Sequence, residues 1–205
     1  ADEIFAGYHW YPPLSRSEDV VADYARVFFD RDHAEMSRVL HPARVGPDHS
    51  VAFVRAALEA PGARTAIDRA LRLDTTVMLI DDPVKRVDNH TMAWGLEARV
   101  PFLDHELVEL AARIPAEHKI RDGGKGVLKA VGRQVLPSEV IDRPKGYFPV
   151  PALKYLSGPL LGRVREILLD RRAQERELFQ ADHVRMLAES PAEHITPLRG
   201  SKLWQ

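Results

Sequence analysis

Two charged residues, Glu97 and Arg99, stand two apart and shortly before Pro101 in this 205-residue chain. A proline keeps the residue before it out of the helical region, and alternate residues of an extended segment point the same way. We therefore expect the carboxylate and the guanidinium to lie beside one another, next to a packed apolar turn. Such a pair can belong to a binding site, or it can be an ion pair that orders the start of the next helix.

A second segment places Lys145 between Pro144 and Gly146, directly after Arg143. The proline fixes its own backbone angle and lacks an N–H, whereas glycine adopts conformations that other residues avoid, so a loop of unusual shape is expected. An ammonium group held in such a loop suits phosphate oxygens or an oxyanion formed during acyl transfer. An ordinary exposed lysine in a turn is the alternative.

Other charged residues have the four-residue spacing of neighbours on a helix. Asp82 and Arg86 can form an ordinary intrahelical ion pair, worth about 0.3–0.5 kcal/mol when exposed. Lys125 and Lys129 follow two glycines at an expected helix start, where backbone N–H groups can also hold an anion such as pyrophosphate. A solvated helical face is the alternative for these lysines.

Nearly every patterned segment predicts a helix, and no series of short Val/Ile-rich strands is present, so the expected fold class is mainly α. The expected helices share an apolar face of helical period and a polar cap, proline or glycine at an end. They are a helix capped at Ser15 that ends near Arg31, one over 48–59, one from Thr65 to Asp81-Asp82-Pro83, one capped by Asp104 and ending before Pro115, one over 127–135, one from Pro159, one capped by Asp182, and the start of one at 201–205.

The composition excludes several classes of function. With 45% hydrophobic residues the chain can bury a core, and its net charge of −1 gives no field for nucleic-acid binding. No apolar run is long enough to span a membrane, and no leader pattern opens the chain, so we expect a cytoplasmic protein. It contains no cysteine, and its nine histidines show no metal-ligand spacing. Homo-oligomerisation is left open.

Three motifs, in order, resemble the synthetase domain of asparagine synthetases. The opening Ala1–Tyr8 is similar to the second half of that family's glycine-rich loop. The second motif is the run 79–104, and the third comprises residues 125–129, 136–137 and 143–148. The resemblance covers nearly all of the chain and is least diagnostic over 12–71. It implies that residues 1–205 form the helical C-terminal part of an α/β ATP-pyrophosphatase-type synthetase domain.

The resemblance also assigns roles near the nucleotide. It implies that Asp2 holds the Mg²⁺ of ATP, because carboxylate oxygens suit that ion, and that Glu3 lies by the pyrophosphate. It implies that Lys145 contacts phosphate and stabilises the charge of the acyl-adenylate steps. Arg143, Gly146 and Lys125 would also lie at the nucleotide or pyrophosphate, although Arg143 could instead only hold its loop.

For the acceptor, the resemblance implies a carboxylate pocket along residues 81–99. Arg86 would bind the carboxylate bidentately, and Asp82 would orient an amine or take its proton. Asp88, Glu97 and Arg99 would contact the substrate. The family often has an arginine after the position of Asp88, whereas this chain has Asn89-His90, which leaves the acceptor open.

The expected enzyme is a ligase that activates a small carboxylate with ATP and Mg²⁺ and converts it to an amide with ammonia from glutamine. The glutaminase domain and phosphate loop of that family are not in these residues, so we expect the chain alone to bind ATP weakly and to be inactive. Residues 8–13 and 144–151 look more like the N-acetylglutaminylglutamine amidotransferase branch than like enzymes that amidate free aspartate. A non-catalytic helical interaction module is the alternative of another class.

Overall fold

The computed structural model describes residues 1–144, 156–197 and 199–204. Its chain divides into two compact units, one of Ala1–Val27 with Val51–Pro144 and one of Phe28–Ser50 with Lys145–Gln205. Within the described ranges the regular structure is helical apart from two isolated bridges, Leu40 with Phe179 and Ile195 with Ser201. The mainly α prediction is therefore confirmed. None of the helices in these ranges is both long enough and apolar enough to cross a membrane.

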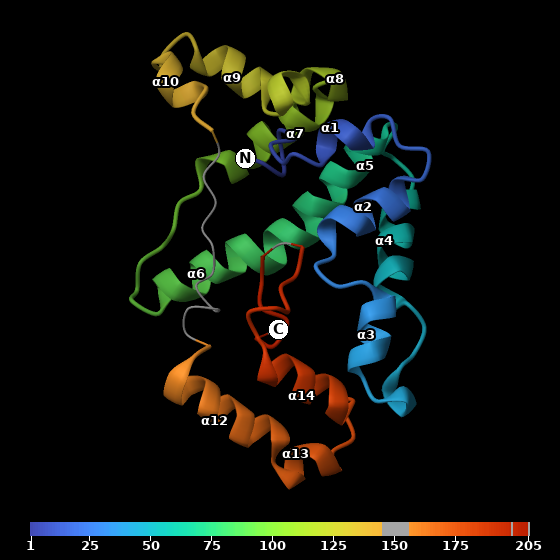
Figure 1. Cartoon of the computed structure of the whole chain (residues 1–205). Helices are drawn as coiled ribbons and strands as arrows, with labels where there is room; N and C mark the ends of the chain where they lie inside the picture. Colours follow the sequence, from blue (N-terminus) through green and yellow to red (C-terminus); the bar gives the residue numbers. More distant parts are fainter. Residues whose placement is uncertain (145–155, 198, 205) are drawn as a thin grey trace. The chain divides into compact units, whose positions relative to one another are not determined.

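The first unit contains most of the helices (Figure 1). They are α1 (Tyr11–Leu14), α2 (Val20–Phe28), α4 (His49–Glu59), α5 (Ala66–Leu73), η2 (Asp74–Met78), η3 (Ile80–Val84), α6 (Lys85–Met92), η4 (Pro101–Leu103), α7 (His105–Arg113), α8 (Ala116–Lys119), η5 (Arg121–Gly123), α9 (Gly126–Gly132) and α10 (Ser138–Ile141).

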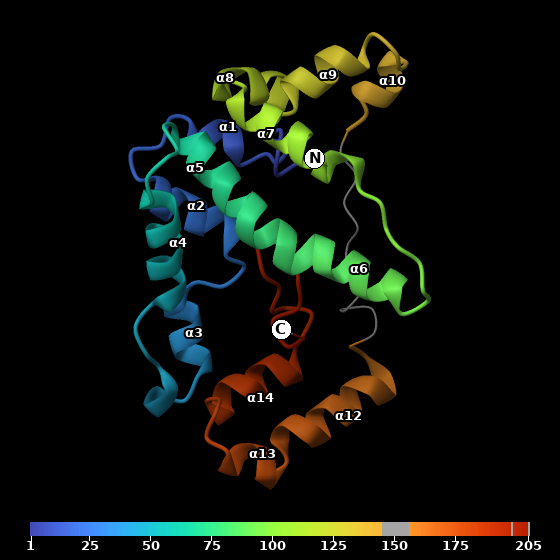
Figure 2. The ribbon, with the colours of Figure 1, turned by 180° about the vertical axis from the view of Figure 1, so that it is seen from behind.

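A long helical run through α5, η2, η3 and α6 passes along this unit, visible in Figures 1 and 2. The prediction that the helix would end at Asp81-Asp82-Pro83 was wrong, because the chain continues through Pro83 in a π-helical segment. A π-turn bonds residues five apart and alters the local backbone spacing, so it can absorb a proline that lacks an N–H.

The fixed point of this unit is a buried polar cluster at the start of η2. Asp74 is fully buried, and its two carboxylate oxygens accept hydrogen bonds from the hydroxyls of Tyr11 and Tyr24. Burial raises the pKa of Asp74 to about 6, although the two tyrosine hydrogen bonds act in the opposite direction. The cluster thus ties α1 and α2 to the long helical run.

Helix starts follow the predicted caps in part. Asp104 caps α7 as predicted, its carboxylate accepting from the N–H groups of Glu106 and Leu107. At α2 the predicted cap was wrong: Asp19, rather than Ser15, accepts from the N–H of Ala22. A carboxylate directly before the first turn reaches the free N–H groups that a residue further upstream cannot.

The second unit contains α3 (His33–Val39), η1 (Pro42–Arg44), α12 (Gly158–Leu169), α13 (Arg171–Glu175) and α14 (Ala181–Glu189). The Gln180 side chain donates to the carbonyls of Ser37 and Leu40, which joins α14 to α3. Gln180 occupies the N-cap position predicted for Asp182, which instead lies in the first turn.

A further prediction, a helix starting at Ser201, was also wrong. The described residues there form a turn, and Ser201 is bridged to Ile195. Arg199 before it has a φ of 63°, a left-handed conformation that favours a reversal over a helix start.

Candidate functional site

The chain's first residues meet the loop before α9. Asp2 Oδ1 lies 2.8 Å from Lys125 Nζ, and the backbone N–H of Lys125 donates to the carbonyl of Phe5 at 3.1 Å. A carboxylate and a lysine from two separate sequence motifs, both predicted to face the nucleotide, are therefore in direct contact. Both side chains remain partly accessible to solvent.

The backbone of this loop explains how the contact forms. Asp122, Gly123, Gly124 and Lys125 all have positive φ values, 54°, 74°, 109° and 56°. Gly124 is also required by space, because a Cβ there would lie 2.3 Å from the carbonyl oxygen of Ala6. Left-handed conformations at non-glycine residues store strain and are often found at functional sites.

The side chain of Lys129 is held by a backbone carbonyl of the same loop. Its ammonium donates to the carbonyl of Asp122 at 2.5 Å and so closes the loop onto α9. Of the two lysines with helical spacing, Lys125 is the one whose side chain meets the opening segment. Their spacing alone did not distinguish these roles, whereas the family resemblance had assigned only Lys125 of the two to the pyrophosphate.

Glu3 is turned into the protein rather than toward solvent. Its carboxylate accepts from the Tyr8 hydroxyl at 2.5 Å, and its carbonyl accepts from Thr75 Oγ1 at 3.3 Å. Burial, together with this hydrogen bond, raises the pKa of Tyr8 above its ordinary value. Glu3 therefore anchors the segment, whereas the Asp2 side chain is 25% exposed, with its Oδ1 atom buried against Lys125.

The charges predicted for an acceptor pocket lie on the exposed side of η3 and α6. Arg86 Nη2 lies 2.9 Å from Asp82 Oδ2, in the intrahelical ion pair that the spacing allows, and Asp88 is exposed on the same helix. The structure brings Asp82 and Arg86 together, with more than half of each side chain open to solvent.

Glu97 and Arg99 also form the expected pair, at 3.0 Å. The packed wall predicted beside them was wrong, because Trp94 is 89% exposed, and Leu96 and Val100 are exposed as well. Residues 96–100 have no regular structure, so neither a ladder nor a helix turns those apolar side chains inward.

The remaining predicted site residues are placed only in part. Arg143 is described and exposed, whereas Lys145 and Gly146 lie outside the described residues. No cluster of three or more His, Cys, Asp or Glu side chains with metal-binding spacing occurs in the part of the chain that the structure describes.

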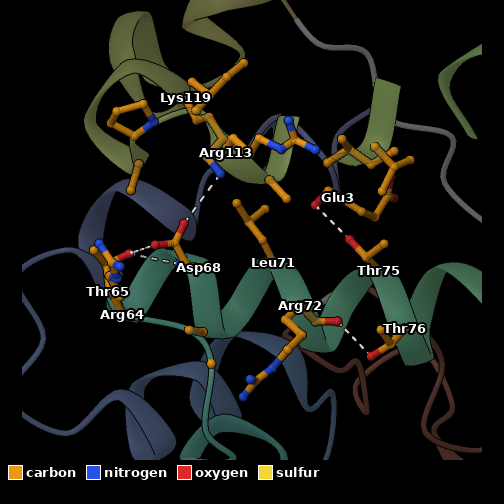
Figure 3. A pocket seen from close by; sticks show the side chains of 18 of the residues that line it. Glu3, Arg64, Thr65, Asp68, Leu71, Arg72, Thr75, Thr76, Arg113 and Lys119 are labelled. Atoms are coloured by element: carbon orange, nitrogen blue, oxygen red, sulfur yellow. Dashed lines mark hydrogen bonds and ion pairs between the residues drawn. The ribbon is translucent and has the colours of Figure 1, made fainter. Parts of the chain in front are cut away.

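A pocket of about 740 Å³ opens between the opening segment, α5, α7 and α8 (Figure 3). One lining residue is Lys119, which is 2% exposed and whose Nζ atom lies 3.4 Å from Asp68 Oδ1 and 3.2 Å from the carbonyl oxygen of Ala111. Thr65 and Asp68 bond one another, and Thr75 bonds Glu3. Of the predicted site residues, Glu3 lines this pocket. No sequence pattern predicts this pocket, since its walls come from four segments that are far apart along the chain.

Comparison with known proteins identifies the family. A family model described as asparagine synthase matches residues 1–205. The chain belongs to the asparagine synthase family. No solved structure matches the chain.

Relatives in this family are named for a glutamine-dependent reaction. The chain is 32% identical over 124 residues to asparagine synthetase [glutamine-hydrolyzing] 1 of Bacillus subtilis, a match that covers 60% of the chain and 19% of that protein. It is 30% identical over 160 residues to asparagine synthetase [glutamine-hydrolyzing] 3 of the same species, covering 73% and 25%. The Gallus gallus asparagine synthetase is 38% identical over 96 residues, covering 44% and 16%. The chain thus spans about a quarter or less of these relatives' length.

Proposed function

We propose that this chain is the C-terminal part of a synthetase domain in a cytoplasmic, glutamine-dependent amidotransferase. The enzyme would activate a carboxylate with ATP as an acyl-adenylate, release pyrophosphate, and let ammonia from glutamine convert the acyl group to an amide. Adenylation divides one difficult displacement into two easier ones, which positioning and electrostatics can accelerate. Family membership and the names of the relatives support this general reaction.

The observation that carries the proposal is the contact between Asp2 and Lys125. A purely structural ion pair does not need a loop of four consecutive residues with positive φ to present its lysine. A site for pyrophosphate does benefit from a lysine held in one place, because its ammonium can stay close to phosphate oxygens without reorganising.

The residues present fit a magnesium ion held jointly with phosphate. Mg²⁺ is commonly bound by one or two carboxylates together with substrate phosphate oxygens and water. Asp2 offers one partly accessible carboxylate, whereas the carboxylate of Glu3 is occupied by Tyr8. When bound, the ion would neutralise negative charge on the phosphate oxygens. Asp2 would then be the ligand, and Lys125 beside it would contact the pyrophosphate.

On the acceptor side, we propose that Arg86 binds the carboxylate and that Asp82 orients the amine or accepts its proton. Their 2.9 Å ion pair lies along the exposed helix surface, and a substrate carboxylate would replace Asp82 as the partner of Arg86. Asp88, Glu97 and Arg99 would add contacts, and Lys145 with Arg143 and Gly146 would serve the adenylate. Aspartate and N-acetylglutaminylglutamine are the two acceptors to be separated.

The test is release of pyrophosphate from ATP by the full-length parent protein, with each candidate carboxylate supplied in turn. We expect release to require Mg²⁺ and one of the carboxylates. Exchange of Arg86 for Gln should raise the KM for that carboxylate by about tenfold or more, because a bidentate charged contact is lost. Absence of carboxylate-dependent release would overturn the proposal and favour a non-catalytic helical module.

A further inference from the structure

We propose that the second unit contains a binding site for a small oxyanion, a phosphate group or a carboxylate, built around Arg31. Three parts of this unit contribute: the segment leading into α3, helix α14, and the described residues 194–197 and 199–202. Both views of the ribbon place α3 and α14 beside one another (Figures 1 and 2).

The first observation is a buried guanidinium without adequate partners. The Arg31 side chain is 11% exposed, and its Nε and Nη2 atoms are fully buried without a hydrogen-bond partner in the described part of the chain. Nε lies 3.4 Å from Glu35 Oε1, which gives attraction but no hydrogen bond. Buried donors in native proteins nearly always find an acceptor, so these donors indicate a missing one.

The second observation is the balance of charge around Arg31. Lys202 Nζ lies 2.6 Å from the same Glu35 Oε1, so two cations share a single carboxylate oxygen. Both contacts are largely buried, with 24% of the Lys202 side chain exposed. Among these three groups one positive charge is left over, where water screens it poorly, and a bound anion would neutralise it.

A third group, His183 on α14, faces the same cluster. Burial, and next the positive charge of Arg31, lower the pKa of His183, while Glu35 raises it and His194 and Arg38 lower it further. The imidazole is thus neutral near pH 7, and its Nε2 atom is also buried with no partner among the described residues. In the tautomer that carries its proton on Nε2, the imidazole would donate to the same anion.

An oxyanion fits these donors better than a water molecule does. The planar guanidinium presents parallel N–H groups that match two oxygens of a phosphate or carboxylate. A single water could accept from Arg31, but it would leave the surplus positive charge in place. None of these residues belongs to the nucleotide or acceptor sites proposed above, so this inference stands independently of that function.

The test is calorimetric titration of the chain at pH 7 in a chloride buffer, with inorganic phosphate in one arm and succinate in another. Sodium chloride at the same ionic strength gives the baseline. We expect saturable binding of one ion per chain in at least one arm. Phosphate alone would identify a phosphate site, and succinate a carboxylate site. The Arg31→Gln variant should bind the ion at least about tenfold more weakly, because charged hydrogen bonds are lost.

The matched control is Arg171→Gln, since Arg171 is 88% exposed in a surface ion pair with Glu175. It should bind as the unchanged chain does. If circular dichroism shows that Arg31→Gln does not fold, Lys202→Gln replaces it, because Lys202 is partly exposed. The Lys202→Gln substitution should weaken binding about threefold or more. No binding in either arm would overturn the proposal. So would a variant of Arg31 or Lys202 that binds as tightly as the unchanged chain. The buried donors would then be satisfied by water.

Discussion

Asp74 is the residue whose surroundings depart furthest from what its type suggests. It is an acidic side chain with no solvent contact, held by Tyr11 and Tyr24 from two other helices. The apolar period of the sequence places Asp74 on the inward face, but nothing in the period identifies the tyrosines, because hydrogen bonds between distant segments leave no local pattern. The same limit applies to Asp2 and Lys125, whose roles were predicted but whose direct contact was not.

The pKa of Asp74, raised to about 6, predicts a pH-dependent stability. The folded chain holds this proton more tightly than the unfolded chain does. The proton bound to Asp74 therefore contributes fully to the free energy of unfolding below the ordinary carboxyl pKa. This contribution is lost as the pH rises through about 6, and above that pH it no longer changes. The Asp74→Asn variant has no titratable carboxyl group at this position. The unfolding free energy of the unchanged chain minus that of the variant should fall by about 2–3 kcal/mol between pH 4 and 7 in urea titrations. A difference that does not vary with pH would contradict the burial of this carboxyl group.

At the scale of elements, helices with long apolar periods were predicted well, including those that became α2, α4, α7 and α12. Local spacing is enough to define such helices. The π-helical segments were missed, because a proline in a helical pattern ordinarily predicts an end, and the compensating change in backbone bonding depends on the neighbours.

Helix capping gives one prediction at this scale. Asp104→Ala removes an acceptor for two N–H groups at the start of α7 and should lower the free energy of unfolding by about 1 kcal/mol. Asp182→Ala is the control, because that side chain is 98% exposed and does not cap α14. Chemical denaturation of the two variants should separate them; equal losses would show that the assignment of caps is wrong.

The loop before α9 gives a second prediction at the scale of elements. Gly124→Ala meets both a φ of 109° and a backbone oxygen 2.3 Å from the new Cβ. Gly95→Ala meets a φ of 66° with no atom within 4 Å, so it measures conformational strain alone, about 1–2 kcal/mol. We expect Gly124→Ala to lower the unfolding free energy by at least about 1 kcal/mol more than Gly95→Ala does. Equal effects of the two substitutions would mean that the opening segment does not pack on this loop.

For the whole molecule, three ordered motifs were sufficient to identify the family, and the family model covers every residue. The mainly α class followed from the absence of strand patterns in the sequence. The division into two units was not predicted, because the second unit is assembled from segments 28–50 and 145–205 that are far apart along the chain. Contacts such as that of Gln180 with Ser37 arise from this tertiary pairing and have no sequence signature.

The contact of Asp2 with Lys125 is the centre of the proposed function, and a charge exchange tests it most directly. Pyrophosphate release by the full-length parent should fall about a hundredfold in Asp2→Asn, which removes the proposed Mg²⁺ ligand, and in Lys125→Met, which removes the positive charge offered to the phosphates. Asp182→Asn and Arg171→Met, both exposed, should leave the rate unchanged. The double variant Asp2→Lys with Lys125→Asp restores an ion pair but reverses the charges offered to Mg²⁺ and phosphate, so it should remain inactive. Recovery of the original rate by this double variant would show that the pair only holds the fold together.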